Sequence, residues 1–210
     1  MKLRKQLGMV LSVSLLLFVA CDMGVNKSFY IEDGETQEGS INTVNGNITI
    51  GKNCTVKGSA RTVNGRIDVG ENSKVEDLQS VNGGIELDKN VMLDGDIQIV
   101  NGDIHCAEGS KINGNIEAVN GDIDLENTDV KRDLSTINGD ISLEEATVIH
   151  GNIVIGNKNS DDHHALRITI ADDSVVEGDI IVKNKHKQVK VFLKNGGKVL
   201  GEIKGAEVVE

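Results

Sequence analysis

The sequence predicts an all-β protein folded as a single-stranded parallel β-solenoid of about eight coils, each formed by 18–19 residues. A motif that reads TVNGNI at 43–48 recurs five times, at 62–67, 80–85, 99–104, 118–123 and 136–141. A Gly-x-Ile signature, GSI at 39–41 and GNI at 114–116, keeps the same period out of phase. Such fixed-period self-similarity is typical of stacked repeats, in which each unit covers the next.

Alignment of the repeats places like residues in columns. One apolar column is Ile48, Ile67, Ile85, Ile104, Ile123 and Ile141. Two residues later the column is Ile50, Val69, Leu87, Cys106, Leu125 and Leu143, and the position between them is polar. This period-two alternation predicts strands with one buried face. Asn-Gly between apolar residues is also a hairpin signal, but antiparallel hairpins do not require matching columns along the whole chain.

The apolar spacing departs from the strict six-residue period of left-handed hexapeptide solenoids, so we expect a right-handed helix. The chain contains no Pro, which suits strands that donate backbone hydrogen bonds in every coil. After Ile153 the Gly-x-Ile intervals lengthen to 27 and 23 residues. Two insertions, an acidic one at 156–164 and a basic one at 183–188, are therefore expected to leave similar corners of the last two coils as neighbouring loops that form ion pairs with each other.

The N-terminus has the pattern of an export signal. Lys2, Arg4 and Lys5 precede an apolar segment at 7–20, which is too short to span a bilayer comfortably. Cys21 follows Ala20 at the position of a lipoprotein cleavage site, although Phe18 stands where Leu is usual. We expect a signal peptide at 1–20, a lipidated Cys21 with a linker and N-terminal cap at 21–38, the solenoid at 39–205 and a tail at 206–210. An ordinary signal peptide is the alternative.

Removal of the first 21 residues leaves 19 Lys and Arg against 33 Asp and Glu, a formal charge of −14. An acidic chain of this kind argues against nucleic acid as a partner, because phosphates are bound by Lys and Arg. The same charge opposes broad contact with anionic lipid, so the membrane partner is expected to be reached through the N-terminal lipid alone.

Few residues have the spacing of a chemical site. Cys54 and Cys106 lie three coils apart, too far for a disulfide, so Cys106 is expected in the core and Cys54 in a turn. Asp161, Asp162, His163 and His164 resemble metal ligands but lack a defined spacing, which favours a solvated loop. Asp103, Asp122 and Asp140 are expected to stack outward with nothing basic in their column, as a solvated face or a weak calcium site.

The motif itself is expected to form a corner between two strands of one coil, with Gly46 and its equivalents at positive φ. Stacking then brings the amide side chains into a hydrogen-bonded ladder. The expected ladder residues are Asn45, Asn64, Asn82, Asn101, Asn120 and Asn138.

The TVNGxI repeats, the Gly-x-Ile signature and the signal-plus-Cys start resemble small bacterial envelope proteins, and over residues 39–155 they are similar to the bactofilins, a polymer-forming cytoskeletal family. They also resemble adhesin-like repeat families. The resemblance implies a β-helix and, for the bactofilins, association through the ends of that helix. Bactofilins are cytosolic, whereas this chain begins with an export signal. Asp22 after Cys21 resembles an inner-membrane retention signal.

The expected function is therefore a non-catalytic structural lipoprotein, a rigid rod that scaffolds or self-associates in the cell envelope. We expect it on the periplasmic side of the inner membrane rather than on the outer membrane or cell surface. No catalytic motif, cofactor or small-molecule substrate is expected. The alternative is an adhesin-like or ligand-binding module that uses the acidic sheet faces.

Overall fold

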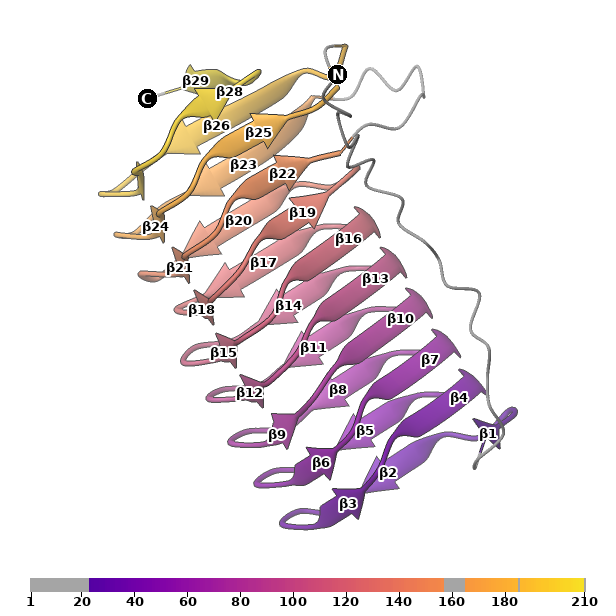
Figure 1. Cartoon of the computed structure of the whole chain (residues 1–210). Helices are drawn as coiled ribbons and strands as arrows, with labels where there is room; N and C mark the ends of the chain where they lie inside the picture. The colour runs from indigo at the N-terminus through magenta and orange to yellow at the C-terminus, as the bar shows by residue number, and fades with distance from the viewer. Residues whose placement is uncertain (1–22, 157–164, 185, 210) are drawn as a thin grey trace, which may run out of the picture.

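The computed structural model describes residues 23–156, 165–184 and 186–209, and these form a parallel β-solenoid (Figure 1). Two sheets have ten strands and the third has nine, so the chain completes about nine turns. The additional turn relative to the expected eight comes from residues 23–38, which form β1, β2 and β3 of the first coil instead of a separate cap. Residues 207–209 of the expected tail likewise form the last strand, β29.

Each coil contributes one strand to each of three parallel sheets. Sheet A contains β1 (Met23–Gly24), β4 (Ile41–Asn45), β7 (Ala60–Asn64), β10 (Leu78–Asn82), β13 (Ile97–Asn101), β16 (Ile116–Asn120), β19 (Leu134–Thr136), β22 (Ile153–Ile155), β25 (Ile180–Val182) and β28 (Ile203–Lys204). Sheet B contains β2 (Phe29–Ile31), β5 (Ile48–Ile50), β8 (Ile67–Val69), β11 (Ile85–Leu87), β14 (Ile104–Cys106), β17 (Ile123–Glu126), β20 (Ile141–Glu144), β23 (Leu166–Ile170), β26 (Val189–Leu193) and β29 (Glu207–Val209). Sheet C contains β3 (Thr36–Glu38), β6 (Thr55–Lys57), β9 (Lys74–Val75), β12 (Met92–Leu93), β15 (Lys111–Ile112), β18 (Asp129–Val130), β21 (Val148–Ile149), β24 (Val175–Val176) and β27 (Lys198–Val199).

Sheets A and B face each other, and the narrower sheet C closes one side (Figure 1). The sheet A strands run from left to right on the near side and the sheet B strands return behind them as the chain rises. This is the sense of a right-handed helix (Figure 1). Neighbouring strands pair in register, so that Ile85 lies between Ile67 and Ile104 and Asn82 lies between Asn64 and Asn101.

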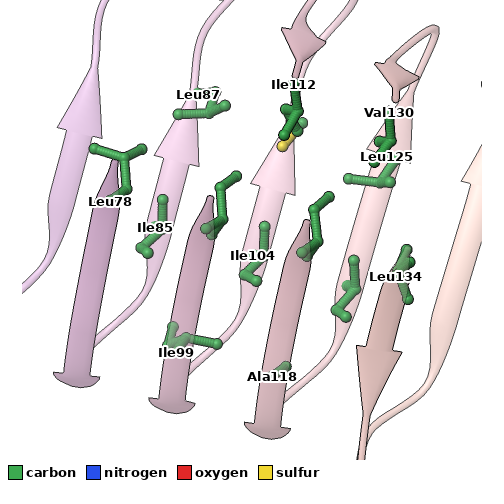
Figure 2. Packing of buried hydrophobic residues seen from close by; sticks show 14 of the residues in the cluster. Leu78, Ile85, Leu87, Ile99, Ile104, Ile112, Ala118, Leu125, Val130 and Leu134 are labelled. Atoms are coloured by element: carbon green, nitrogen blue, oxygen red, sulfur yellow. The ribbon is translucent and has the colours of Figure 1, made fainter. Parts of the chain in front are cut away.

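The core is a stack of aliphatic side chains enclosed by the three sheets (Figure 2). Ile85 and Ile104 from sheet B, Leu78 from sheet A and Ile112 from sheet C point into the same interior and are buried. Burial of each such side chain contributes roughly 1.5–3 kcal/mol. With few aromatic residues available, repetition of the same aliphatic shape at each level fills the narrow interior without gaps.

Both described cysteines are free and buried. Cys106 takes the place of Leu87 and Leu125 in the core column, and its burial raises the pKa of its thiol. Cys54, expected in a turn, directly follows the turn at 52–53 and faces inward, and its Sγ donates to the carbonyl of Glu32 at 3.0 Å. Ser73 occupies the equivalent position in the next coil, where its Oγ accepts from the backbone N–H of Cys54 at 2.9 Å.

The corner between sheets B and C contains a left-handed residue in each coil. Asn53, Asn72, Asn90 and Asn127 have φ between 40 and 59°, as Asn tolerates better than most residues. Ala146 holds the equivalent position with φ 60°, where its Cβ crowds the following carbonyl.

The substitution Ala146→Gly is therefore expected to raise the free energy of unfolding by roughly 0.5–1 kcal/mol, because glycine adopts positive φ without that crowding. Ala107→Gly is the matched control: it lies at the same corner without positive φ, and should lower stability instead. Urea unfolding measures both, and an Ala146→Gly protein less stable than the parent contradicts the prediction.

Candidate functional site

The six asparagines of the recurring motif form a continuous amide ladder at the corner between sheets A and B. Each Asn donates its Nδ2–H to Oδ1 of the Asn one coil earlier, with distances of 2.7–3.0 Å. Asn45 extends the ladder by donating to Asn26, which is followed by Lys27 and so lies outside the Asn-Gly motif. At the other end, Lys187 Nζ donates to Asn138 Oδ1 at 2.6 Å.

Lys187 closes the ladder from two coils away. Both insertions replace the Asn-Gly corner, between β22 and β23 and between β25 and β26, as expected from the sequence. Lys187 lies in the second insertion and also donates to the carbonyl of Ile137 at 3.2 Å. The acidic half of the expected loop–loop ion pairing lies at 157–164, outside the described residues.

The glycines of the motif are required by close packing between coils. A Cβ at Gly65 would lie 2.0 Å from the carbonyl oxygen of Gly46, and one at Gly121 would lie 1.9 Å from that of Gly102. The expectation of positive φ is correct for Gly83, Gly102, Gly121 and Gly139 but wrong for Gly46 and Gly65. The shared constraint is therefore the backbone of the neighbouring coil, which leaves no room for a side chain.

A second ladder explains the Gly-x-Ile signature at the corner between sheets C and A. Here a side-chain oxygen accepts from the backbone N–H of the equivalent residue in the next coil. Asp77 accepts from Asp96 at 3.0 Å, Asp96 accepts from Asn115 at 2.6 Å, and Asp133 accepts from Asn152 at 2.7 Å. The small acidic or amide residue between Gly and Ile thus connects successive coils.

The three stacked aspartates, Asp103, Asp122 and Asp140, likewise accept hydrogen bonds from the backbone of the next coil. Asp103 accepts from the N–H of Asp122 at 2.9 Å, and Asp122 accepts from that of Asp140 at 2.7 Å. Arg167 then donates to Asp140 from both its backbone N–H and its guanidinium, each at 2.8 Å. The expectation that nothing basic enters this column is wrong. Arg167 follows Asp140 in the column, and Arg66 lies two coils before Asp103. Among the described residues, no group of three or more His, Cys, Asp or Glu is placed to hold a metal ion.

The outer face of sheet B is hollowed near its C-terminal end. The hollow has a volume of about 410 Å³ and crosses β17, β20, β23 and β26. Its central file runs from Asp124 through Ser142 and Thr169 to Phe192, which pair in register from strand to strand. Small hydroxyl side chains between a carboxylate and an aromatic ring create the depression.

Charged side chains of both signs line the hollow. Asp122, Asp140 and Arg167 line one side, and Lys194 lies near Phe192, with its Nζ 5.5 Å from the ring centroid. Asp124 has no hydrogen-bond or ion-pair partner in the described part of the chain. The sequence pattern does not mark Arg167, Phe192 or Lys194 as site residues. The alternation in LRITI and VKVFL places Arg167 and Phe192 outward, but nothing in it shows that they meet Asp124.

Burial raises the pKa of Asp124 above its ordinary value, and the nearby Asp122 carboxylate raises it further. His105, which precedes Asp124 in the file, opposes the shift. The charged form of Asp124 is therefore disfavoured in the folded protein, so its ionisation at neutral pH costs stability.

Six sequence-predicted residues lie outside the described part of the chain. Cys21, the expected lipid-attachment residue, precedes the described residues, as does Asp22. The possible metal ligands Asp161, Asp162, His163 and His164 fall within 157–164. Within the described residues, no helix is long and apolar enough to cross a membrane.

No protein-family model, curated protein or solved structure matches this chain at a significant level.

Replacement of a middle rung of the ladder, Asn101→Ala, is expected to lower the free energy of unfolding by about 1 kcal/mol, because it removes two amide hydrogen bonds that remain open to water. Asn42→Ala is the control, since Asn42 lies on the outer face of sheet A outside the ladder. Chemical denaturation distinguishes them, and equal stability of the two variants would count against the ladder.

Asp124→Asn is expected to stabilise the protein at pH 7 by a few tenths of a kcal/mol, since solvent screens this exposed group. Because the pKa of Asp124 is raised, the folded state binds the proton more tightly than the unfolded state does. The stability lost by ionising Asp124 therefore grows as the pH rises from the unfolded-state pKa through the folded-state pKa, and no stability is lost below both. Thermal unfolding at pH 7 and pH 3 tests this. A gain of equal size at both pH values contradicts it.

Proposed function

We propose that this protein is a non-catalytic structural rod that associates end to end through its C-terminal coil. The single observation that carries the proposal is the exposure of apolar side chains at that end. Leu200 is 66% exposed and Val208 is 44% exposed, while the core residues Val199 and Ile203 are only half-buried. A second copy of the same coil would cover these side chains and shield apolar surface from water.

The strand edges support the same assignment. β27, β28 and β29 each pair on one side only, which leaves backbone groups available to another chain. The first coil also has open edges, but its inward positions are more polar. Gln37 stands in the column that Val56 continues, and Lys27 Nζ lies 5.0 Å from the Phe29 ring centroid. Val25 of the first coil is also exposed, so the choice of the C-terminal coil rests on Leu200 and Val208 together with the half-buried Val199 and Ile203.

Rigidity suits a scaffolding role. Nine coils at the spacing of paired strands make a rod about 40 Å long. Ion pairs between coils, such as Lys52 with Glu71 and Lys89 with Glu108, line its exposed surface. The similarity of the repeat to the bactofilins favours a structural role over a catalytic one, and the proposal includes no cofactor.

We further propose that the rod is exported and held at a membrane by a lipid on Cys21. The charged and apolar N-terminal segments and the formal charge of −14 after their removal support an acidic rod tethered by its lipid alone. Asp22 favours the periplasmic face of the inner membrane. Metabolic labelling with a fatty acid tests this proposal, and label retained in Cys21→Ser would contradict it.

A Leu200→Lys substitution is expected to abolish end-to-end association, because it places a charge within the apolar contact. Electron microscopy of purified residues 22–210 should show rods joined at their ends for the parent and single rods for the variant. Met92→Lys is the matched control, since Met92 is an exposed apolar residue on sheet C in the middle of the rod. Single parent rods at all concentrations and salt conditions would refute the association.

The alternative, a binding module, is favoured by a different observation, the hollow on sheet B. The two functions are compatible because the hollow opens on the side of the rod.

A further inference from the structure

The hollow on sheet B combines an aromatic wall with a floor of hydroxyl groups. The ring of Phe192 lies next to Thr169, and Ser142 follows one coil further along. Phe192 is one of only four aromatic residues in the sequence, and it lies on the outer face of sheet B and not in the core. A sugar ring offers an apolar C–H face to an aromatic ring and hydroxyl groups to polar side chains, as this lining requires.

The charges in the hollow are separated along the rod. Asp140 and Arg167 neutralise each other, which leaves the carboxylates of Asp122 and Asp124 at one end and the ammonium of Lys194 at the other. Asp122 uses one oxygen to accept the N–H of Asp140, whereas Asp124 uses neither. Burial and repulsion by Asp122 raise the pKa of Asp124, and a bound cation at this end would favour the ionised carboxylate against both.

The dimensions suit a short oligosaccharide. Asp124 and Phe192 are three strands apart in the sheet, which corresponds to about 14 Å at the usual spacing. A volume of about 410 Å³ lies in the range of small-molecule sites. A ligand must therefore be longer than one sugar to reach the ring and the free carboxylates together.

We propose that the hollow binds a segment of an amino-sugar glycan that carries a free amine, with one ring against Phe192 and the amine at Asp122 and Asp124. Ser142 and Thr169 face the intervening hydroxyl groups. Lys194, whose Nζ lies over the Phe192 ring in the free protein, moves aside to donate to sugar oxygens. An anionic ligand of the same length is opposed by the two carboxylates. This inference does not depend on the proposed end-to-end association.

The test is isothermal titration calorimetry of the full chain in detergent with a glucosamine tetramer. Its comparison ligands are the N-acetylglucosamine tetramer, which lacks the amines, the cellulose tetramer and a galacturonate tetramer. We expect saturable binding of the glucosamine tetramer, at least tenfold tighter than that of the other three. Equal affinity for the N-acetylated tetramer, a preference for galacturonate or no binding overturns the proposal.

Variants locate the binding. Phe192→Leu and Asp124→Asn are each expected to weaken binding of the glucosamine tetramer at least tenfold. The matched controls are Tyr30→Leu and Glu86→Gln, an aromatic residue and a carboxylate of the same outer file outside the hollow. Circular dichroism establishes that each variant is folded. Folded Phe192→Leu and Asp124→Asn proteins that bind as tightly as the parent overturn the assignment.

Leu200→Lys separates the two proposals, because it alters the rod end and leaves the hollow unchanged. It is expected to bind the glucosamine tetramer as the parent does. A loss of binding in this variant shows that the ligand sits at the rod end and contradicts the assignment to the hollow.

Discussion

The whole structure depends on backbone hydrogen bonding between successive coils in strict register. Once strand β11 pairs with β8 and β14, each residue lies directly above its equivalent, and every position along the coil becomes a column. Inward columns must share one size and polarity, because an irregular side chain would leave a gap or a clash in a narrow core. Register also forces like residues together on the outside, which is tolerable only where their side chains can bond to one another.

The three corners meet this requirement with different chemistry. Asparagine amides bond to one another between sheets A and B, side-chain oxygens accept backbone N–H groups between sheets C and A, and inward hydroxyls accept them between sheets B and C. Each arrangement satisfies polar groups where the chain turns and strand pairing is interrupted. Among the described residues, no buried side-chain nitrogen or oxygen lacks a partner. Glu145 and Ala146 stand out because both have the left-handed backbone conformation although neither residue type favours it.

We expect binding surfaces where the repeated columns of like residues end or change in side-chain size. The apolar columns end uncovered at Val199 and Ile203, which gives the rod one end with a preference for another copy. On sheet B, small residues interrupt a file of larger side chains between Asp124 and Phe192, and the face becomes concave there. Both features arise in the C-terminal part of the chain, where the insertions also relax the period. A regular repeat therefore provides the support, and departures from it provide the surfaces that can distinguish a partner.

The sequence by itself determined the parallel solenoid, the inward columns and the corner role of Asn-Gly, because period-two alternation within an 18–19-residue repeat admits one stacked arrangement. It also led to the amide ladder, since residues at equivalent positions must lie one coil apart. Only the tertiary structure decided that residues 23–38 form a coil, that glycine is required by contact with the neighbouring backbone, and that Lys187 closes the ladder. It alone brought Asp124, Arg167 and Phe192 to one hollow. The physical reason is that burial constrains inward residues to a recognisable pattern, whereas outward side chains are free to vary and acquire their neighbours only when distant coils stack.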